Sequence, residues 1–390
     1  MELKRILVQI HHGYWRVEMQ EYLDSILRGI CEKLQLTKSL YDKANERYQT
    51  IAKILDKNDA LHGIELNIYP QGSFKLETTV KPIYQNEYDL DFVAELPKSA
   101  QLQPEELYNK IYWILKGDGI HDEMVERKNR CIRVNYANDF HLDIMPAKLY
   151  NSNTKEIIVP DRELKNWYHH SNPIRYAEWF ESRARTVVFS SLMESRRLTA
   201  SITPVTQQEI TEKLEPLRKA VQLIKRYRDI YCDRYKKEPV RSIVICTLMG
   251  GISSTYSDTL QIIRDFCVYV NLLASQNEGN PFEIKNPVVD EILTEKWHEN
   301  ANNFYDFLEM VEALAQDIYK LQTYSTNRDM DALLKKMFGE KVTNDAIIEN
   351  AQRIETARQS DRLFIDASGT IKTDNGEIPI KKNTFYGEKV

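Results

Sequence analysis

Two aspartates separated by one residue, shortly after a Gly-Ser pair, constrain this chain more than any other feature. The aspartates are Asp89 and Asp91, and the pair is Gly72-Ser73. Side chains of a strand alternate between faces, so the two carboxylates project together while Leu90 points to the buried side. Paired carboxylates suit Mg²⁺, which prefers oxygen ligands, and a Gly-Ser turn can bring N–H groups and a hydroxyl to a phosphate. The stretch predicts a site for a nucleoside triphosphate and metal.

A third carboxylate is needed to hold two metal ions, and Asp143 is the candidate. Residues 140–146 alternate between apolar and polar positions, and residues 131–136 are also typical of a strand, with a predicted hairpin turn at 137–139. Asp143 could then lie on a strand beside Asp89 and Asp91. This pattern is that of the nucleotidyltransferase superfamily with a polymerase-β-like palm. There, two metals roughly 3.5–4 Å apart hold the attacking hydroxyl and the leaving pyrophosphate.

Each element also has a simpler interpretation. An Asp-x-Asp pair is most often the solvated face of an edge strand, and a lone Gly-Ser pair is usually a turn. The combination of a Gly-Ser pair after a strand, an Asp-x-Asp strand and a third aspartate on an alternating strand is much rarer. The combination therefore favours the metal site.

Composition limits the class of protein. A chain of 390 residues can form one large bilobal unit or two to three domains. The net charge of −5 argues against a general attraction to nucleic acid, although a local basic cleft stays open. The five cysteines are scattered without a Cys-x-x-Cys pair, which indicates a reducing compartment and neither a zinc site nor a disulfide frame. With neither a signal-peptide pattern nor a long apolar run, we expect a cytoplasmic protein without a membrane span.

The order of helical and strand-like segments predicts an α+β fold. Residues 1–60 are typical of helices, including one that would support the back of the sheet, and a further helix begins at Pro104 and ends at Gly117. We expect His169-His170 in a surface loop, a break at 198–204, and helices beyond. The predicted organisation is N-terminal helices and palm lobe at 1–150, a helical lobe closing the cleft at 151–360, and a polar, mobile tail at 361–390.

One helix, predicted within residues 212–235, carries a run of basic residues beside its apolar stripe. Such a run is usually a solvated face. A metal-loaded triphosphate, however, needs further cations along its β and γ phosphates, and Lys225 or Arg226 could supply one. The next helix would begin near Ser242, whose hydroxyl would lie where the helix dipole favours phosphate.

Several segments together resemble the cGAS/DncV-like nucleotidyltransferases. The palm segments are Gln71-Gly72-Ser73, Thr78-Thr79-Val80-Lys81-Pro82, Asp89-Leu90-Asp91 and Leu142-Asp143-Ile144-Met145-Pro146. Segments at 171–180, 223–229, 242–244 and 286–288 look like the helical lobe of that family and move the resemblance towards its bacterial antiviral-signalling branch. The resemblance runs from about residue 65 to about residue 300.

The resemblance implies a bilobal, polymerase-β-like enzyme with a mixed-sheet palm and a helical lobe. It would join nucleoside triphosphates, ATP among them, into a cyclic di- or trinucleotide with release of pyrophosphate, and the product would activate an effector in antiphage defence. Asp89, Asp91 and Asp143 would bind two Mg²⁺ ions, for which Mn²⁺ could substitute, and Asp143 would help to activate the attacking hydroxyl. The phosphates would contact the following residues: Gln71, Gly72, Ser73, Lys225 and Ser242.

Partners and alternatives follow from the same resemblance. Some relatives have a regulatory partner or a conjugating partner that acts on the C-terminus, but this chain ends in Glu388-Lys389-Val390 rather than a small residue. A first alternative keeps the fold but adds nucleotides to an RNA end, tRNA or protein. The acidic balance argues against that reaction and against a stable complex with long nucleic acid. A nucleotide-binding scaffold is the second alternative, and the presence of all three aspartates argues against it.

Overall fold

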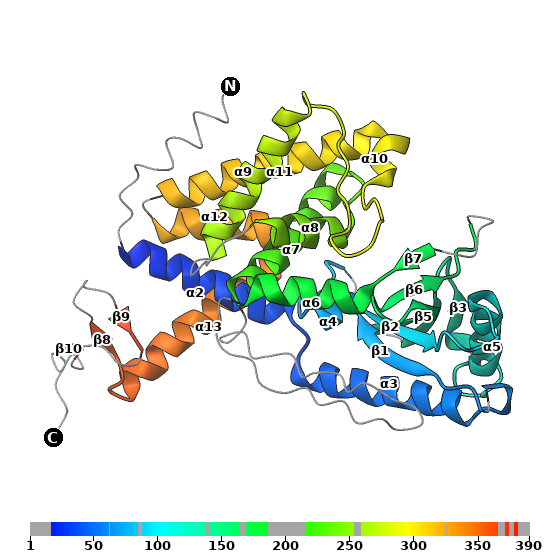
Figure 1. The fold of residues 1–390 in the computed structure, drawn as a ribbon. Helices are drawn as coiled ribbons and strands as arrows, with labels where there is room; N and C mark the ends of the chain where they lie inside the picture. The colour runs from blue at the N-terminus through cyan, green and yellow to red at the C-terminus, as the bar shows by residue number, and fades with distance from the viewer. Residues whose placement is uncertain are drawn as a thin grey trace, which may run out of the picture.

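The computed structural model describes residues 17–61, 63–84, 88–136, 140–163, 169–185, 215–252, 259–324, 326–365, 371–373 and 378–380. The predicted hairpin turn at 137–139, the break at 198–204 and the chain end at 381–390 lie outside these residues. Figure 1 shows a sheet with its own helices joined to a larger group of helices. This is the α+β, bilobal arrangement that the sequence predicted.

The palm lobe is built on a mixed sheet. Its main path runs β1-β2-β5-β4-β3, while β6 pairs with β5, and β7 with β6. Strands β2 and β5 are parallel and the other pairs are antiparallel. The strands are β1 (Asn67–Gln71), β2 (Tyr88–Leu96), β3 (Val125–Arg127), β4 (Ile132–Tyr136), β5 (Phe140–Asn151), β6 (Glu156–Val159) and β7 (His169–Ser171). His169 and His170 therefore lie in a strand and not in the predicted loop.

Two helices of the palm pack against the sheet, α3 (Lys38–Lys57) and α5 (Pro104–Lys116), with short 3₁₀ turns at Asp59–Leu61 and Asp122–Met124. Tyr48 of α3 stacks on Phe92 of β2 with ring centroids 4.4 Å apart. Helix α5 begins at its proline, and the Gln103 N–H donates to the Glu106 carboxylate at 2.8 Å. Both helices thus pack against the face of the sheet on which Leu90 is buried, and α3 supports the back of the sheet as the sequence predicted.

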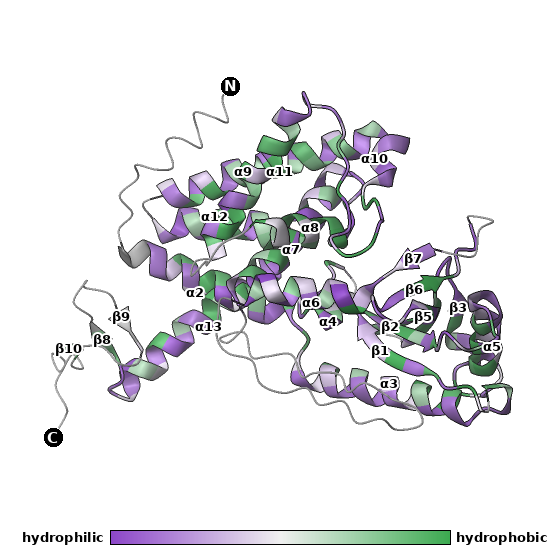
Figure 2. Cartoon of the chain, viewed as in Figure 1, coloured by the Kyte–Doolittle hydropathy of each residue, from purple (hydrophilic) through white to green (hydrophobic). Residues whose placement is uncertain are grey.

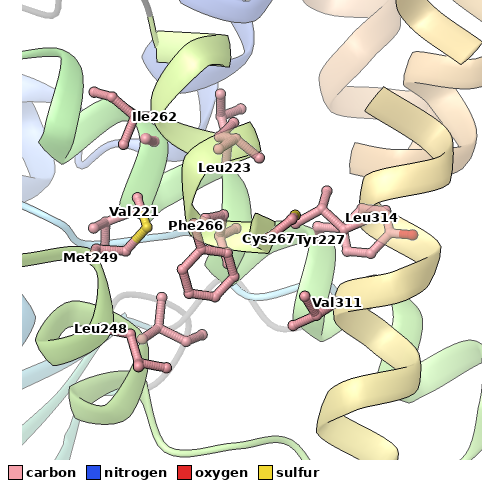
Figure 3. Packing of buried hydrophobic residues seen from close by; sticks show 14 of the residues in the cluster. Val221, Leu223, Tyr227, Leu248, Met249, Ile262, Phe266, Cys267, Val311 and Leu314 are labelled. Carbon is pink, nitrogen blue, oxygen red and sulfur yellow. The ribbon is translucent and has the colours of Figure 1, made fainter. Parts of the chain in front are cut away.

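The helical lobe has α7 at its centre. Helices α2, α8, α9 and α12 all contact α7, and Figure 3 shows Val221 and Tyr227 of α7 with Phe266 of α9 and Leu314 of α11. Figure 2 shows that α8 is hydrophobic along most of its length, which agrees with its burial. The helices are α2 (Val17–Leu34), α6 (Pro173–Ala184), α7 (Pro216–Tyr235), α8 (Ser242–Gly251), α9 (Thr259–Gln276), α10 (Glu295–Glu299), α11 (Ala301–Thr323), α12 (Asn327–Phe338) and α13 (Glu340–Gln359).

Helix α2 belongs to the helical core, although the predicted boundaries grouped it with the palm. Its apolar stripe is buried against α7 and α13. A Cβ at Gly29 would lie 3.0 Å from the Cβ of Ala346, so α2 and α13 cross closely there. Arg353 also pairs with Glu32 at 2.5 Å. Along the sequence, the palm is therefore inserted between α2 and the remaining helices of the helical core.

The segment beyond α13 contains a small antiparallel sheet where the sequence predicted only a polar tail. Its strands are β8 (Phe364–Ile365), β9 (Ile371–Lys372) and β10 (Ile378–Pro379), in the order β10-β8-β9. Across the part of the chain that the structure describes, no helix combines the length and apolar character that a membrane span requires.

Candidate active site

The three predicted aspartates meet on neighbouring strands. Strand β2 lies parallel to β5, and the register pairs Asp91 with Asp143 and Asp89 with His141. Asp143 is buried, Asp91 is partly open to the cleft and Asp89 is exposed, while Leu90 is fully buried on the other face. The alternation that predicted a shared face for the carboxylates is therefore confirmed.

Gly72 is fitted to Asp91 at the end of β1. Its φ is +60°, in the left-handed region that favours glycine, and a Cβ there would overlap the Asp91 carboxylate and lie 3.0 Å from its Cγ. The neighbouring residue Gln71 is paired with Asp91 in the antiparallel ladder of β1 and β2, which keeps Gly72 close to Asp91. Ser73 follows directly, and its carbonyl accepts from the Thr78 N–H at 2.9 Å. Gly72 and Ser73, which begin the short helix α4 (Gly72–Lys75), thus lie directly against the Asp91 carboxylate.

Arg133 is the cation closest to the aspartates, and sequence reasoning did not identify it. Strand β4 pairs Arg133 with Asp143, and the guanidinium donates to both Asp143 oxygens, at 2.7 and 2.8 Å. It also pairs with Asp89 at 3.1 Å. The hydrogen bonds to Asp143 raise the pKa of Arg133, which stays charged. The sequence could have indicated this contact, because a predicted hairpin with a three-residue turn at 137–139 places residue 133 opposite residue 143.

The three carboxylates offer the oxygen ligands that a divalent cation prefers, although they do not converge on one point. The pKa of Asp91 is raised to about 7, first by burial and then by the Asp143 and Asp89 carboxylates, against the opposing charges of Arg133 and Lys225. A cluster of acidic oxygens in a partly enclosed site is stabilised by a bound cation. Among the described residues, however, no three Asp, Glu, His or Cys side chains converge closely enough to hold a metal, and the Asp143 oxygens face Arg133. Carboxylate oxygens are ligands that Mg²⁺ prefers, but in this structure Arg133 occupies those of Asp143 and one of Asp89.

A cavity of about 650 Å³ opens over these side chains and reaches the helical lobe. This volume is within the usual range for a small-molecule site. All the predicted residues except Arg226 line it, together with residues that the sequence did not single out as site residues, among them Thr78, Thr79, Arg133, Arg228, Asp229, Asn286 and Glu291. The predicted residues in the wall are Gln71, Gly72, Ser73, Asp89, Asp91, Asp143, Lys225 and Ser242.

The helical wall of the cavity carries two buried cations, Lys225 and Arg228, and Arg228 pairs with the Asp229 carboxylate at 2.6 Å. The Lys225 ammonium donates to the Thr78 carbonyl at 2.8 Å, and burial lowers the pKa of Lys225. Arg228 donates to the Val240 carbonyl at 2.8 Å and to the Ser242 hydroxyl at 3.0 Å. The basic run is therefore not the solvated face that such runs usually form, because backbone carbonyl groups and the Asp229 carboxylate supply partners for these charges.

Arg226, the other cation named as a candidate, lies away from the cavity. Its guanidinium donates to the Phe338 carbonyl at 2.8 Å and to the Lys81 carbonyl at 3.1 Å. Successive helical residues differ by about 100° in direction, so residues 225 and 228 share a face and residue 226 does not. Within α7, Lys225 and Arg228 are therefore the cations that face the cleft.

The cavity floor carries a further sign of a polar ligand. Thr79 is 2% exposed, and its hydroxyl has no hydrogen-bond partner within the described residues. Its carbonyl, by contrast, accepts from the Gln222 amide at 3.2 Å. An unpaired buried hydroxyl costs about 1–3 kcal/mol. A polar group of a bound ligand would remove that cost.

The contrast between Lys225 and Arg226 yields a prediction. The Lys225→Met variant is expected to raise KM for the nucleotide by roughly 10- to 100-fold, because a hydrogen bond from a charged group contributes about 1.5–3 kcal/mol. The matched Arg226→Met variant should instead lower the melting temperature and leave KM near the wild-type value. Steady-state kinetics and thermal melts of both variants check this. Equal effects on KM would contradict the assignment.

Comparison with known proteins identifies relatives of the chain. Residues 22–183 match the family described as the Second Messenger Oligonucleotide or Dinucleotide Synthetase domain. The chain is 30% identical over 382 residues to a c-di-GMP synthase of Roseivirga ehrenbergii, covering 94% of this chain and 97% of that protein. It is 25% identical over 401 residues to the cyclic dinucleotide synthase CdnG of Bradyrhizobium diazoefficiens, covering 94% of this chain and 95% of that protein.

Solved structures show the same fold. The structure of Bradyrhizobium diazoefficiens CdnG in complex with GTP matches with a TM-score of 0.70 at 23% identity, covering 85% of this chain and 99% of that one. The CdnC:HORMA-deltaN complex of E. coli MS115-1 matches with a TM-score of 0.60 at 13% identity, covering 83% and 98%. Together with the full-length relatives, these matches confirm the predicted polymerase-β-like fold. The protein is a nucleotidyltransferase that synthesises cyclic oligonucleotides, and it belongs to the cGAS/DncV-like nucleotidyltransferases.

Proposed function

We propose that the enzyme joins two GTP molecules into a cyclic dinucleotide by two-metal nucleotidyl transfer. The single observation that carries the chemistry is the register pair of Asp91 with Asp143 beneath Gly72, in the wall of the cavity. The names of the relatives support guanine, since one is a c-di-GMP synthase and CdnG was solved with GTP. The sequence alone favoured ATP among the substrates.

The order of the strands supports a proposal for where the donor triphosphate and the attacking hydroxyl would lie. From β1 across β2 to β5, the sheet presents Gly72 with Ser73, then Asp91, then Asp143. The Gly-Ser turn would hold the triphosphate of the donor nucleotide, with Lys225 and Ser242 on the facing wall. The attacking ribose hydroxyl would then approach from the β5 side, where an Asp143 oxygen accepts its proton.

Each of the two rounds follows the same chemistry. The hydroxyl oxygen forms a bond to the α-phosphorus of the donor, the bond from that phosphorus to the bridging oxygen breaks, and pyrophosphate leaves. Two Mg²⁺ ions bound to Asp89, Asp91 and Asp143 would neutralise the charge that develops on the entering and leaving oxygens. Lys225 and Arg228 would add positive charge along the departing phosphates.

We further propose that the product is a signal in antiphage defence that activates an effector, with regulation by a partner protein. The solved complex of CdnC with a HORMA protein supports the possibility of such a partner. We place the enzyme in the cytoplasm, where nucleoside triphosphates are made and where the five free cysteines would stay reduced.

The product assay tests the proposal. The purified enzyme is incubated with each nucleoside triphosphate and with the mixture, in Mg²⁺, and the products are treated with phosphatase before mass spectrometry. GTP alone is expected to give a phosphatase-resistant mass equal to two GMP units less two waters. The Asp89→Ala/Asp91→Ala double variant is the control and should give none. Linear products, or label on added RNA or protein, would contradict cyclisation, and a product that requires ATP would contradict the choice of guanine.

A further inference from the structure

Arg133 has a place in the active site that the proposed reaction does not require. Its guanidinium engages both oxygens of Asp143 and one oxygen of Asp89, which are two of the three carboxylates expected to hold metal. A guanidinium that binds a carboxylate through two parallel N–H groups makes one of the stronger ion pairs in proteins. The same oxygen atoms cannot accept these hydrogen bonds and bind a metal at full strength.

The backbone that carries Arg133 is fixed, whereas its side chain faces the cleft. The flanking residues Ile132 and Val134 are fully buried, and β4 is hydrogen-bonded to β5 along its length. The Arg133 side chain is 22% exposed, compared with 12% for Asp143. Any release of the carboxylates is therefore a rotation of the arginine side chain, with the strands left in place.

We propose that Arg133 is a built-in placeholder that competes with the metal ions for the oxygens of Asp143 and Asp89. This inference deepens the proposed function and rests on the metal site assigned there. Without metal, three carboxylates in one site repel one another, and the guanidinium stabilises two of them. When metal binds, the guanidinium is repelled by it and loses its partners, so metal binding requires its release.

The competition gives the enzyme an order of binding. In the absence of nucleotide, a metal ion would have to displace Arg133 with only protein carboxylates and water as ligands. A triphosphate adds oxygen ligands of its own, as is usual for Mg²⁺ sites. Metal is therefore expected to bind weakly alone and far more tightly with nucleotide, and the empty enzyme stays in its arginine-bound form.

The test measures metal binding without nucleotide, using Mn²⁺ and electron paramagnetic resonance to count free ion. Arg133→Gln is expected to bind Mn²⁺ about 10-fold or more tightly than the wild type, because the competing guanidinium is gone. Arg133→Lys keeps the positive charge but lacks the planar fork that engages both oxygens. It should also bind Mn²⁺ more tightly than the wild type. Wild-type affinity in Arg133→Lys, or no gain in Arg133→Gln, would overturn the proposal.

Two further variants distinguish an error in the proposed metal site from an error in the proposed role of Arg133. Arg130 pairs with Asp161 at 2.6 Å in the same lobe, so Arg130→Gln also loses an ion pair and should leave Mn²⁺ affinity unchanged. Asp91→Asn should abolish the tighter Mn²⁺ binding of Arg133→Gln and weaken further the binding of the wild type. If Asp91→Asn binds normally, the metal site itself is wrong. If it loses binding while the Arg133 variants bind like the wild type, the site is right and the placeholder role is wrong.

A second readout needs no titration. In EDTA, Arg133→Gln is expected to melt at a lower temperature than the wild type, because the three carboxylates lose their cation. Saturating Mn²⁺ should then raise the melting temperature of Arg133→Gln by more than it raises that of the wild type. An equal or smaller rise in the variant would show that the arginine does not occupy the metal-binding oxygens.

Discussion

Replacing Asp91 by asparagine is expected to reduce nucleotidyl transfer on the order of a thousandfold or more while the protein stays folded. Metal ions contribute several kcal/mol to the transition state of such a displacement, and each 1.36 kcal/mol corresponds to about tenfold in rate. Asparagine has nearly the same shape as aspartate, so the fit beneath Gly72 is retained. The measurement is the initial rate of pyrophosphate release from GTP, compared with the wild type at equal concentration.

Although Asp91→Asn should lose activity, its metal-free form should be more stable than the metal-free wild type near neutral pH. In EDTA the pKa of Asp91 in the folded protein is about 7, raised from the ordinary value by burial and by the neighbouring carboxylates. Burial of the ionised form disfavours the folded state, so the stability of the wild type falls as the pH rises from the ordinary carboxyl pKa of 3.8 to about 7, and it levels off above that pH. The variant should lose less stability over that range. Asp56→Asn, at an exposed position on α3, is the control for both assays. An inactive variant that is also unfolded would not support a metal-binding role.

Replacing Gly72 by alanine should cause the second large effect. The new Cβ would overlap the Asp91 carboxylate, and an alanine at a φ of +60° adds backbone strain of about 1–3 kcal/mol. Either the turn or Asp91 must move, and a displacement of about 1 Å near reacting groups can reduce the rate by about a hundredfold. We expect a loss of activity of at least that size, together with a lower melting temperature.

Gly63→Ala provides a close control for this variant. Gly63 has a φ of +75°, yet a Cβ there would meet nothing within 4 Å. This variant therefore incurs a similar strain without the overlap, and it should lose stability but keep its rate. If Gly63→Ala and Gly72→Ala lost activity equally, the effect of Gly72 would come from strain in the chain and not from its contact with Asp91.

The carboxylates were predictable because short-range rules determine their placement. Period-two alternation put Asp89 and Asp91 on one face and buried Leu90, and the same alternation placed Asp143 on a strand of its own. The approach of Gly72 to Asp91 follows from the absence of a side chain. None of these inferences needed to know how the two lobes pack.

The cations were predicted less well because their partners are distant in sequence. Lys225 donates to the Thr78 carbonyl, 147 residues away, and Arg226 donates to the Phe338 carbonyl, 112 residues away. An apolar stripe reveals one buried face of α7, but not that backbone carbonyl groups meet its other faces. Arg133 differs, because a hairpin register alone would have placed it opposite Asp143.

The crossing of α2 with α13 has a consequence for the way the enzyme is made. The Ser25 hydroxyl donates to Asn350 across 325 residues of chain. A ribosome adds about 5–20 residues each second, so α2 waits roughly 15–65 s for its partner helix. The whole palm sheet is synthesised within that interval and can assemble first. Helices α2 and α12 both contact α7, which carries Lys225 and Arg228, so this wall of the cleft gains its full support only near the end of translation.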